Sequence, residues 1–74
     1  SKRTLRRKLT EEAQSFQSLL VSVRGGLADH YLERSHLSLG EISFLLGFQE
    51  STSFIRAYRT WKGISPGQYR QQLN

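Results

Sequence analysis

Short hydroxyl side chains and arginines follow one another late in the chain, and together they could bind nucleic acid. The side chains are Ser51, Thr52, Ser53, Arg56 and Arg59. Hydroxyl groups can donate or accept a hydrogen bond, and they are short enough to let a helix approach a surface closely. One turn later, an arginine can form paired hydrogen bonds with a guanine edge or with a phosphate. This combination favours contact with a polyanion over bond-breaking chemistry.

Groups suited to catalysis or metal binding are sparse. The chain has no cysteine, and its two histidines, His30 and His36, have no second pair of ligands at metal-binding spacing. Glu11 and Glu12 fit the surface of a helix end better than an acid/base pair. The sequence has no glycine-rich phosphate loop and no nucleophile beside a base. We therefore expect no enzyme, no catalytic residue, no cofactor and no metal.

Charge is distributed unevenly along the chain. Residues 1–9 carry five basic residues and no acid, residues 10–50 carry two basic residues against six acidic ones, and residues 51–74 carry four basic residues and no acid. Two basic segments around an acidic middle fit a polyanion that touches both ends. An anionic membrane surface is a weaker alternative, because the aromatic residues fit a core. No apolar run approaches the ~18 residues of a membrane span.

Apolar residues recur at helical spacing along nearly the whole chain, and no stretch shows sustained strand-type alternation. The longest stripe keeps its phase across Gly25-Gly26, so we expect one helix there although each glycine costs roughly 1 kcal/mol relative to alanine. This stripe consists of Phe16, Leu19, Leu20, Val23, Leu27 and Tyr31. The predicted helices cover residues 2–12, 15–34, 38–46, 50–62 and 65–73.

Start and stop signals support these helix ends. Residues 38–41 and 65–68 each form a capping box, in which the first and last residues satisfy each other's backbone donors. Ser15 can cap the long helix. Gly47 and Gly63 are placed to end helices in a left-handed turn.

The helix predicted over residues 50–62 has two different faces. Its apolar face carries Phe54, Ala57, Tyr58 and Trp61. Thr52, Ser53, Arg56 and Arg59 lie largely on the opposite face. A short helix and a tight turn at residues 47–49 precede it. Two short helices, a glycine-containing turn and a polar outer face describe a helix-turn-helix, whose second helix approaches base edges with its N-terminal residues.

The segment LSLGEISFLLGFQESTSFIRAYRTWKGISPGQYRQQL, residues 37–73, carries a dense set of motif residues. They are Ile42, Leu46-Gly47-Phe48, Phe54, Arg56, Tyr58 and Gly63-x-Ser65-Pro66-x-x-Tyr69-Arg70. With this set the segment resembles the second helix-turn-helix and closing helix of the AraC/XylS family of bacterial transcription regulators. Residues 1–20 are similar to the recognition helix of the family's first module and the start of its linker helix.

Four positions depart from the family pattern. Tyr58 stands where the family usually has Phe, and Ser43 where it prefers Ala. Ala13 stands where Gly usually ends the third helix, and Ile55 where a small or polar residue is common. Ile55 makes a contact with a thymine methyl group conceivable without settling a base preference.

The resemblance implies an all-α, homeodomain-like bundle of about five helices. A truncated first module (residues 1–14) would be joined by a linker helix (15–36) to a complete second module (37–74). By the same resemblance, module two would contact DNA through the five residues named first, and module one through Arg3, Arg6 and Arg7. A helix of about 20 residues is roughly 30 Å long, and successive major-groove faces are ~34 Å apart, so two modules could reach adjacent segments.

The resemblance also implies partners. Double-stranded DNA is the expected partner of an activator of this kind, RNA polymerase is a candidate second partner, and the bacterial cytoplasm, at the nucleoid when bound to DNA, is the expected compartment. The effector-binding and dimerisation domain of such a regulator, and two helices of its first module, are expected to be absent from this chain. The alternative function is a helical protein-interaction module that docks RNA polymerase or a partner subunit. In this alternative, an exposed face with Leu5 and Leu9 could dock a partner helix.

Overall fold

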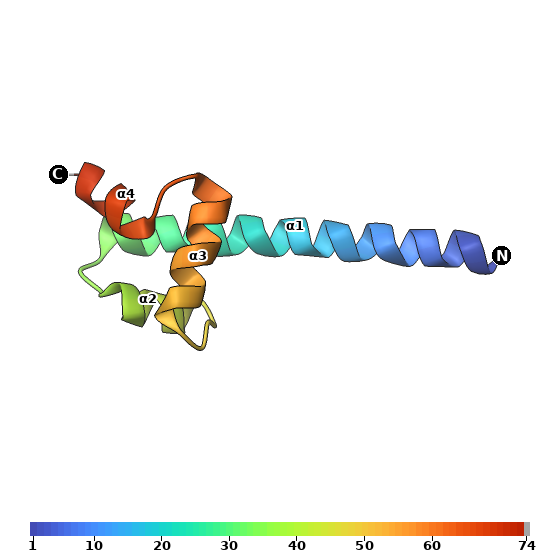
Figure 1. The fold of residues 1–74 in the computed structure, drawn as a ribbon, viewed down its shortest axis with the longest axis horizontal. Helices are drawn as coiled ribbons and strands as arrows, with labels where there is room; N and C mark the ends of the chain where they lie inside the picture. Colours follow the sequence, from blue (N-terminus) through green and yellow to red (C-terminus); the bar gives the residue numbers. More distant parts are fainter. Residues whose placement is uncertain (74) are drawn as a thin grey trace.

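The computed structural model describes residues 1–73, which form four helices and no strand. The helices are α1 (Lys2–Arg34), α2 (Leu39–Leu45), α3 (Ser51–Lys62) and α4 (Pro66–Gln72). The molecule measures 55 × 22 × 18 Å because α1 extends far beyond the other helices, which gather at its C-terminal end (Figure 1). Asn74, the last residue of the predicted second module, lies outside the described residues.

α1 is one uninterrupted helix, so the predicted break between residues 12 and 15 and the count of five helices are wrong. Ser1, not Ser15, caps its start, with its hydroxyl accepting a hydrogen bond from the Thr4 N–H at 3.3 Å. The local sequence explains the continuity. Residues 9–18 contain neither proline nor glycine, and Glu, Ala and Gln in this stretch are good helix formers. Nothing in this stretch therefore stops the helix.

The other predicted helix ends are confirmed to within one residue. Capping boxes are present at Ser38 with Glu41 and at Ser65 with Gln68, and the first of these starts α2 while the second starts α4. Gly47 (φ 92°) follows α2 and Gly63 (φ 84°) follows α3. A side chain would be strained in both of these left-handed conformations.

The core lies where α2, α3 and α4 meet the last third of α1. Its buried apolar residues are Ala28, Leu32, Ile42, Leu46, Phe54 and Tyr58. Trp61 is partly buried against this cluster. The prediction that the aromatic face of α3 turns inward is thus confirmed.

The long apolar stripe of α1 is not the face that packs against the rest of the chain. Phe16 and Leu19 are each 62% exposed, and Leu27 is 44% exposed. The buried residues of α1 are Gly25, Ala28 and Leu32, which lie nearly opposite the stripe at 3.6 residues per turn. Gly25 faces α3, and a Cβ there would lie 3.5 Å from Cε of Lys62, an ordinary van der Waals contact. Tyr31, at the end of the stripe, is partly buried against the core. The expected single helix across Gly25-Gly26 is confirmed.

Candidate nucleic-acid interface

α3 presents one face to the core and the other to solvent. Phe54 and Tyr58 are buried, and they are spaced four residues apart so that they anchor one side of the helix. Four of the five predicted contact residues, Thr52, Ser53, Arg56 and Arg59, are exposed on the other side, whereas Ser51 lies at the start of the helix, on the side of Tyr58, and is partly buried. The structure therefore brings the five predicted residues of the second module together on one helix, with their polar groups accessible.

Asp29 of α1 fixes the position of α3. The Tyr58 hydroxyl donates a hydrogen bond to Asp29 Oδ1 at 2.6 Å, and Lys62 Nζ lies 2.8 Å from Asp29 Oδ2. Burial raises the pKa of Tyr58, and the hydrogen bond to the Asp29 carboxylate raises it further. Both oxygens of one carboxylate thus hold two positions a turn apart on α3. α3 therefore cannot rotate about its own axis without breaking these contacts.

α4 is fastened to α1 in a similar way. The Tyr69 hydroxyl donates a hydrogen bond to the Glu33 carboxylate, which raises the pKa of Tyr69 to about 12, with desolvation contributing less. Arg70 Nη1 donates to the carbonyl oxygen of Leu37 at 2.6 Å, and Nη2 donates to that of Tyr31 at 3.3 Å. Arg70 also donates to the carbonyl of Leu32 at 3.4 Å, an acceptor that the end of α1 leaves open. The carbonyl of Tyr31 accepts from the Ser35 N–H as well.

These contacts divide the basic residues of the last quarter of the chain into two groups. Lys62 and Arg70 contact other residues of the protein, Lys62 through its ion pair with Asp29 and Arg70 through hydrogen bonds to backbone carbonyls. Arg56 and Arg59 are exposed, and within residues 1–73 neither makes an ion pair. Two of the four basic residues in residues 51–74 therefore make contacts within the protein. The other two, Arg56 and Arg59, lie on the outer face of α3.

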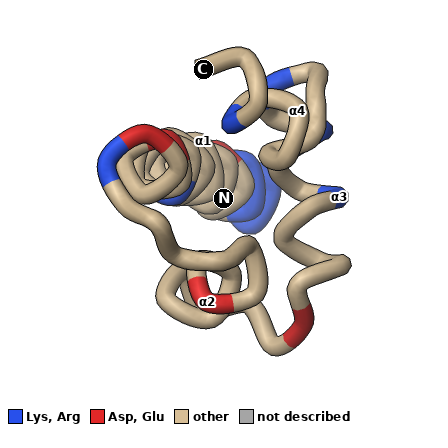
Figure 2. The backbone as a smooth tube through the Cα atoms, turned by 90° about the vertical axis from the view of Figure 1, so that its left-hand side faces the viewer, with Lys and Arg blue, Asp and Glu red and all other residues tan. Residues whose placement is uncertain are grey.

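The turn between α2 and α3 is held by stacking on Phe48. Its ring packs against Phe54 and Trp61, with ring centroids 5.8 Å and 6.3 Å apart. On α1, the guanidinium of Arg24 lies 5.1 Å from the centroid of the Phe48 ring, a cation–π distance. Figure 2, which looks along α1, shows α2, α3 and α4 arranged around this helix. Phe48 therefore connects the turn before α3 both to α3 itself and to α1.

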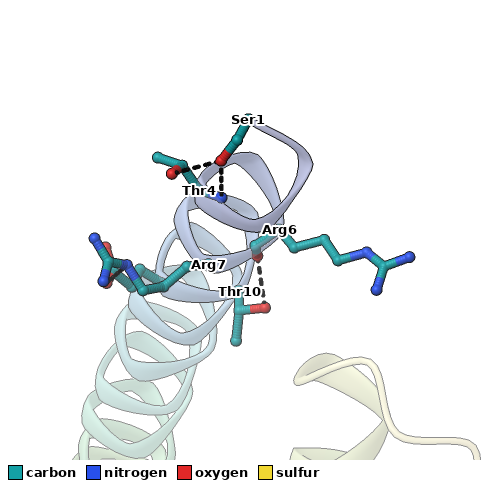
Figure 3. A network of polar contacts seen from close by, with 6 residues as sticks. Ser1, Thr4, Arg6, Arg7 and Thr10 are labelled. Carbon is teal, nitrogen blue, oxygen red and sulfur yellow. Dashed lines mark hydrogen bonds and ion pairs between the residues drawn. The ribbon is translucent and has the colours of Figure 1, made fainter.

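The predicted contact residues of the first module lie apart from those on α3. Arg3, Arg6 and Arg7 are exposed on the first two turns of α1. Figure 3 shows the side chains of Arg6 and Arg7, and Arg7 Nε lies 3.9 Å from Glu11 Oε1. Gly25, which faces α3, is five helical turns beyond Arg7, or about 27 Å along the axis. Because 18 residues make five whole turns, Arg7 points from the same side of α1 as the face that packs against α3.

Sequence reasoning missed the polar contacts that position the interface. Asp29 and Lys62 were counted only as charges and Arg70 only as a charge and a motif residue, although they join residues that are 29 to 39 positions apart in sequence. One signal was available: Tyr58 stands at a core position where Phe is usual in the resembling family, and a buried hydroxyl needs a partner. Within the described chain no three metal-ligating side chains cluster, and no helix is long and apolar enough to cross a membrane.

A family model described as a helix-turn-helix domain matches residues 1–72. The chain belongs to the AraC/XylS family of transcription regulators. Membership confirms the predicted family and the helix-turn-helix fold class. It also makes the chain part of the DNA-binding unit of a transcription regulator.

Relatives of this AraC/XylS chain carry regulator names. The ornithine utilization regulator of Pseudomonas aeruginosa is 45% identical over 71 residues, which cover 96% of this chain and 21% of that protein. The urease operon transcriptional activator of Escherichia coli is 39% identical over 69 residues, covering 93% of this chain and 23% of that protein. The crystal structure of transcriptional regulator CdpR from Pseudomonas aeruginosa matches with a TM-score of 0.76 at 35% identity, covering 96% of this chain and 22% of that one. This chain spans about a fifth of the length of these relatives.

Proposed function

We propose that the chain binds double-stranded DNA in a sequence-specific way, with α3 lying in the major groove. The observation that carries this proposal is the division of α3 into a buried aromatic face and an accessible face of hydroxyls and unpaired arginines. The helix is about 18 Å long at 1.5 Å per residue, and the major groove is ~12 Å wide, which admits an α-helix.

Each residue on this face has a role in the proposal. Ser51, Thr52 and Ser53 lie on the first turn of α3, where the N-terminal residues of a recognition helix approach base edges. Arg56, one turn further on, reaches a guanine edge or a phosphate. Arg59 lies one more turn along and contacts the phosphate backbone, where a positive charge adds affinity without sequence information.

The N-terminal end of α1 supplies a second, weaker contact in this proposal. Arg3, Arg6 and Arg7 would touch DNA from the truncated module of residues 1–14, with residues 15–36 as the linker and residues 37–74 as the complete module. Arg3 lies 22 residues before Gly25, about 33 Å along α1, which is close to the ~34 Å between successive major-groove faces.

The proposal extends to the whole regulator. We place it in the bacterial cytoplasm as a transcription activator, supported by the similarity to the urease operon transcriptional activator, and assign the chain no catalytic step. An effector-binding and dimerisation domain fits the remaining length of the relatives. RNA polymerase is the proposed protein partner. Its support is the apolar surface that Phe44 (78% exposed) and Leu45 (53% exposed) form on α2.

The test is selection of binding sites from a random duplex library at low and at physiological salt. We expect one enriched block for α3, and a second block about one helical turn away where the end of α1 also binds. Arg56→Ala should remove the first block or relax one of its positions, and Arg59→Ala should lower the slope of log affinity against log salt by about one.

The matched control for both variants is Arg34→Ala, which removes the same charge from an exposed position at the end of α1. It should leave the enriched block unchanged. A folded chain that enriches no sequence, or an Arg56→Ala variant that selects as the unmodified chain does, contradicts the proposal. Apolar docking of a protein partner would then become the better hypothesis, since its affinity depends only weakly on salt.

A further inference from the structure

Glu50 places a carboxylate without a capping role at the N-terminal end of α3. It is the N-cap residue of this helix, with extended backbone angles (φ −135°, ψ 145°), yet its side chain makes no capping hydrogen bond. Ser, Thr, Asp and Asn are the usual N-cap residues, because their short side chains reach the free N–H groups of the first turn. The carboxylate of Glu50 is exposed instead, so its position is not explained by capping.

The Glu50 carboxylate is held in place on one side only. Thr52 Oγ1 donates a hydrogen bond to Glu50 Oε2 at 3.4 Å, a long and weak contact. Within residues 1–73, Glu50 Oε1 has no hydrogen-bond partner and Glu50 makes no ion pair. The free oxygen therefore lies beside Thr52, a residue that already belongs to the accessible face of α3.

A carboxylate at this position opposes binding to DNA as such. Phosphates repel it, and every nearby acceptor on a base edge repels it as well. In the major groove guanine presents only acceptors and thymine an acceptor and a methyl group, whereas adenine presents its N6 amino donor directly beside the N7 acceptor. Cytosine presents its N4 amino donor with no acceptor of its own in the groove. Among the four bases, cytosine is thus the one that best compensates this charge.

We propose that Glu50 is a specificity-determining residue that accepts a hydrogen bond from the N4 amino group of one cytosine. This inference rests on the proposed function, in which α3 enters the major groove. Thr52 holds Oε2, and Oε1 faces the base. The carboxylate then acts twice, because it favours one base at one position and lowers affinity for all other DNA.

A role of Glu50 in stabilising the helix alone predicts a different result for its replacement. A negative charge at the start of a helix interacts favourably with the helix dipole. If that were the whole role of Glu50, replacing it would change the melting temperature slightly and leave base selection untouched. Base selection is therefore the readout that separates the two roles.

The experiment compares site selection by the unmodified chain, by Glu50→Gln and by Glu41→Gln, with folding checked by circular dichroism. Glu41→Gln is the matched control, because it removes one negative charge from α2 while glutamine still completes the capping box with Ser38. We expect the unmodified chain and the control to select cytosine at one common position. Glu50→Gln should lose this preference, with a drop of roughly 5- to 100-fold in discrimination there, and should bind mixed-sequence DNA more tightly.

The outcomes distinguish a wrong role for Glu50 from a failure of the proposed DNA binding. If Glu50→Gln keeps the preference of the unmodified chain at every position, the role of Glu50 is wrong while the proposed function stands. If both glutamine variants lose the same preference, the effect is one of net charge, which also overturns the inference. If the folded, unmodified chain selects no sequence at all, the proposed function fails and the inference fails with it.

Discussion

The projecting part of α1 and the packed helix α3 behave differently although both carry an apolar stripe at helical spacing. Phe16 and Phe54 are both aromatic residues on apolar helical stripes, yet Phe16 is 62% exposed and Phe54 is fully buried. Around residues 25–34, α2, α3 and α4 pack on α1, whereas the first two thirds of α1 project into solvent (Figure 1). Periodicity therefore predicts that a helix forms and which side is apolar. It does not predict whether that side has a partner.

The largest expected effect is the loss of a buried aromatic ring from the packed region. Phe54→Ala should lower the free energy of unfolding by about 3–5 kcal/mol, because it removes a large buried side chain and leaves a cavity. Leu9→Ala in the projecting region should change it by less than about 0.5 kcal/mol, since Leu9 is 57% exposed. Thermal denaturation followed by circular dichroism checks both. Equal losses in the two variants would mean that the projecting stripe packs in solution.

The second effect concerns arginines that look alike in the sequence. Arg70→Ala should cost about 2–3 kcal/mol, because the charged side chain donates to several carbonyl oxygens between α1 and α2 that would lose this partner. Arg6→Ala, at an exposed position in the projecting region, should cost less than about 0.5 kcal/mol. Urea denaturation measures the difference. An Arg70→Ala variant as stable as Arg6→Ala would show that the carbonyls are equally well satisfied by water.

The smallest expected change in the free energy of unfolding comes from removing single hydroxyl groups. Tyr58→Phe should cost roughly 1 kcal/mol at neutral pH, because Asp29 loses a buried donor but keeps Lys62. Thr10→Val removes a solvent-exposed hydrogen bond to the Arg6 carbonyl and should cost a few tenths of a kcal/mol.

The pH dependence of this smallest effect has a definite sign. The pKa of Tyr58 is raised in the folded protein, so above the ordinary tyrosine value of 10 the unfolded chain loses its proton first and unfolding becomes more favourable. The difference in stability between the unmodified chain and Tyr58→Phe should therefore shrink as pH rises above 10, as measured by urea denaturation at a series of pH values. A difference that grows instead would mean that the hydroxyl is ionised in the folded state.

Local signals allowed the second helix-turn-helix to be predicted well. Both capping boxes, the glycines at 47 and 63, and the inward face of α3 depend on residues within a few positions of one another, so the sequence displays them directly. The motif residues in the same segment made the family recognisable. The contact residues on α3 stay predictions, although the structure places them on one accessible face.

Non-local contacts were the part that could not be predicted. Nothing near Asp29 in sequence indicates that its carboxylate meets Tyr58 and Lys62, and nothing near Gly25 indicates that Lys62 lies against it. The predicted break before Ser15 failed for another reason. A serine can begin a helix, but it also sits within one when good helix formers precede it, and α1 continues through Ser15.

α3 and α4 are attached only near the C-terminal end of α1, so the rest of α1 can tilt about this attachment. The attachment consists of the contacts of Asp29 and Glu33 and the hydrogen bonds of Arg70 to backbone carbonyls. From this point to Lys2 the arm is about 40 Å long, so a swing of roughly 10° moves its tip by about 7 Å. That displacement is about two base-pair steps of the ~3.4 Å repeat along DNA. In the proposed complex with DNA, the angular stiffness of these contacts would therefore set how accurately the two ends of the molecule are spaced along the duplex.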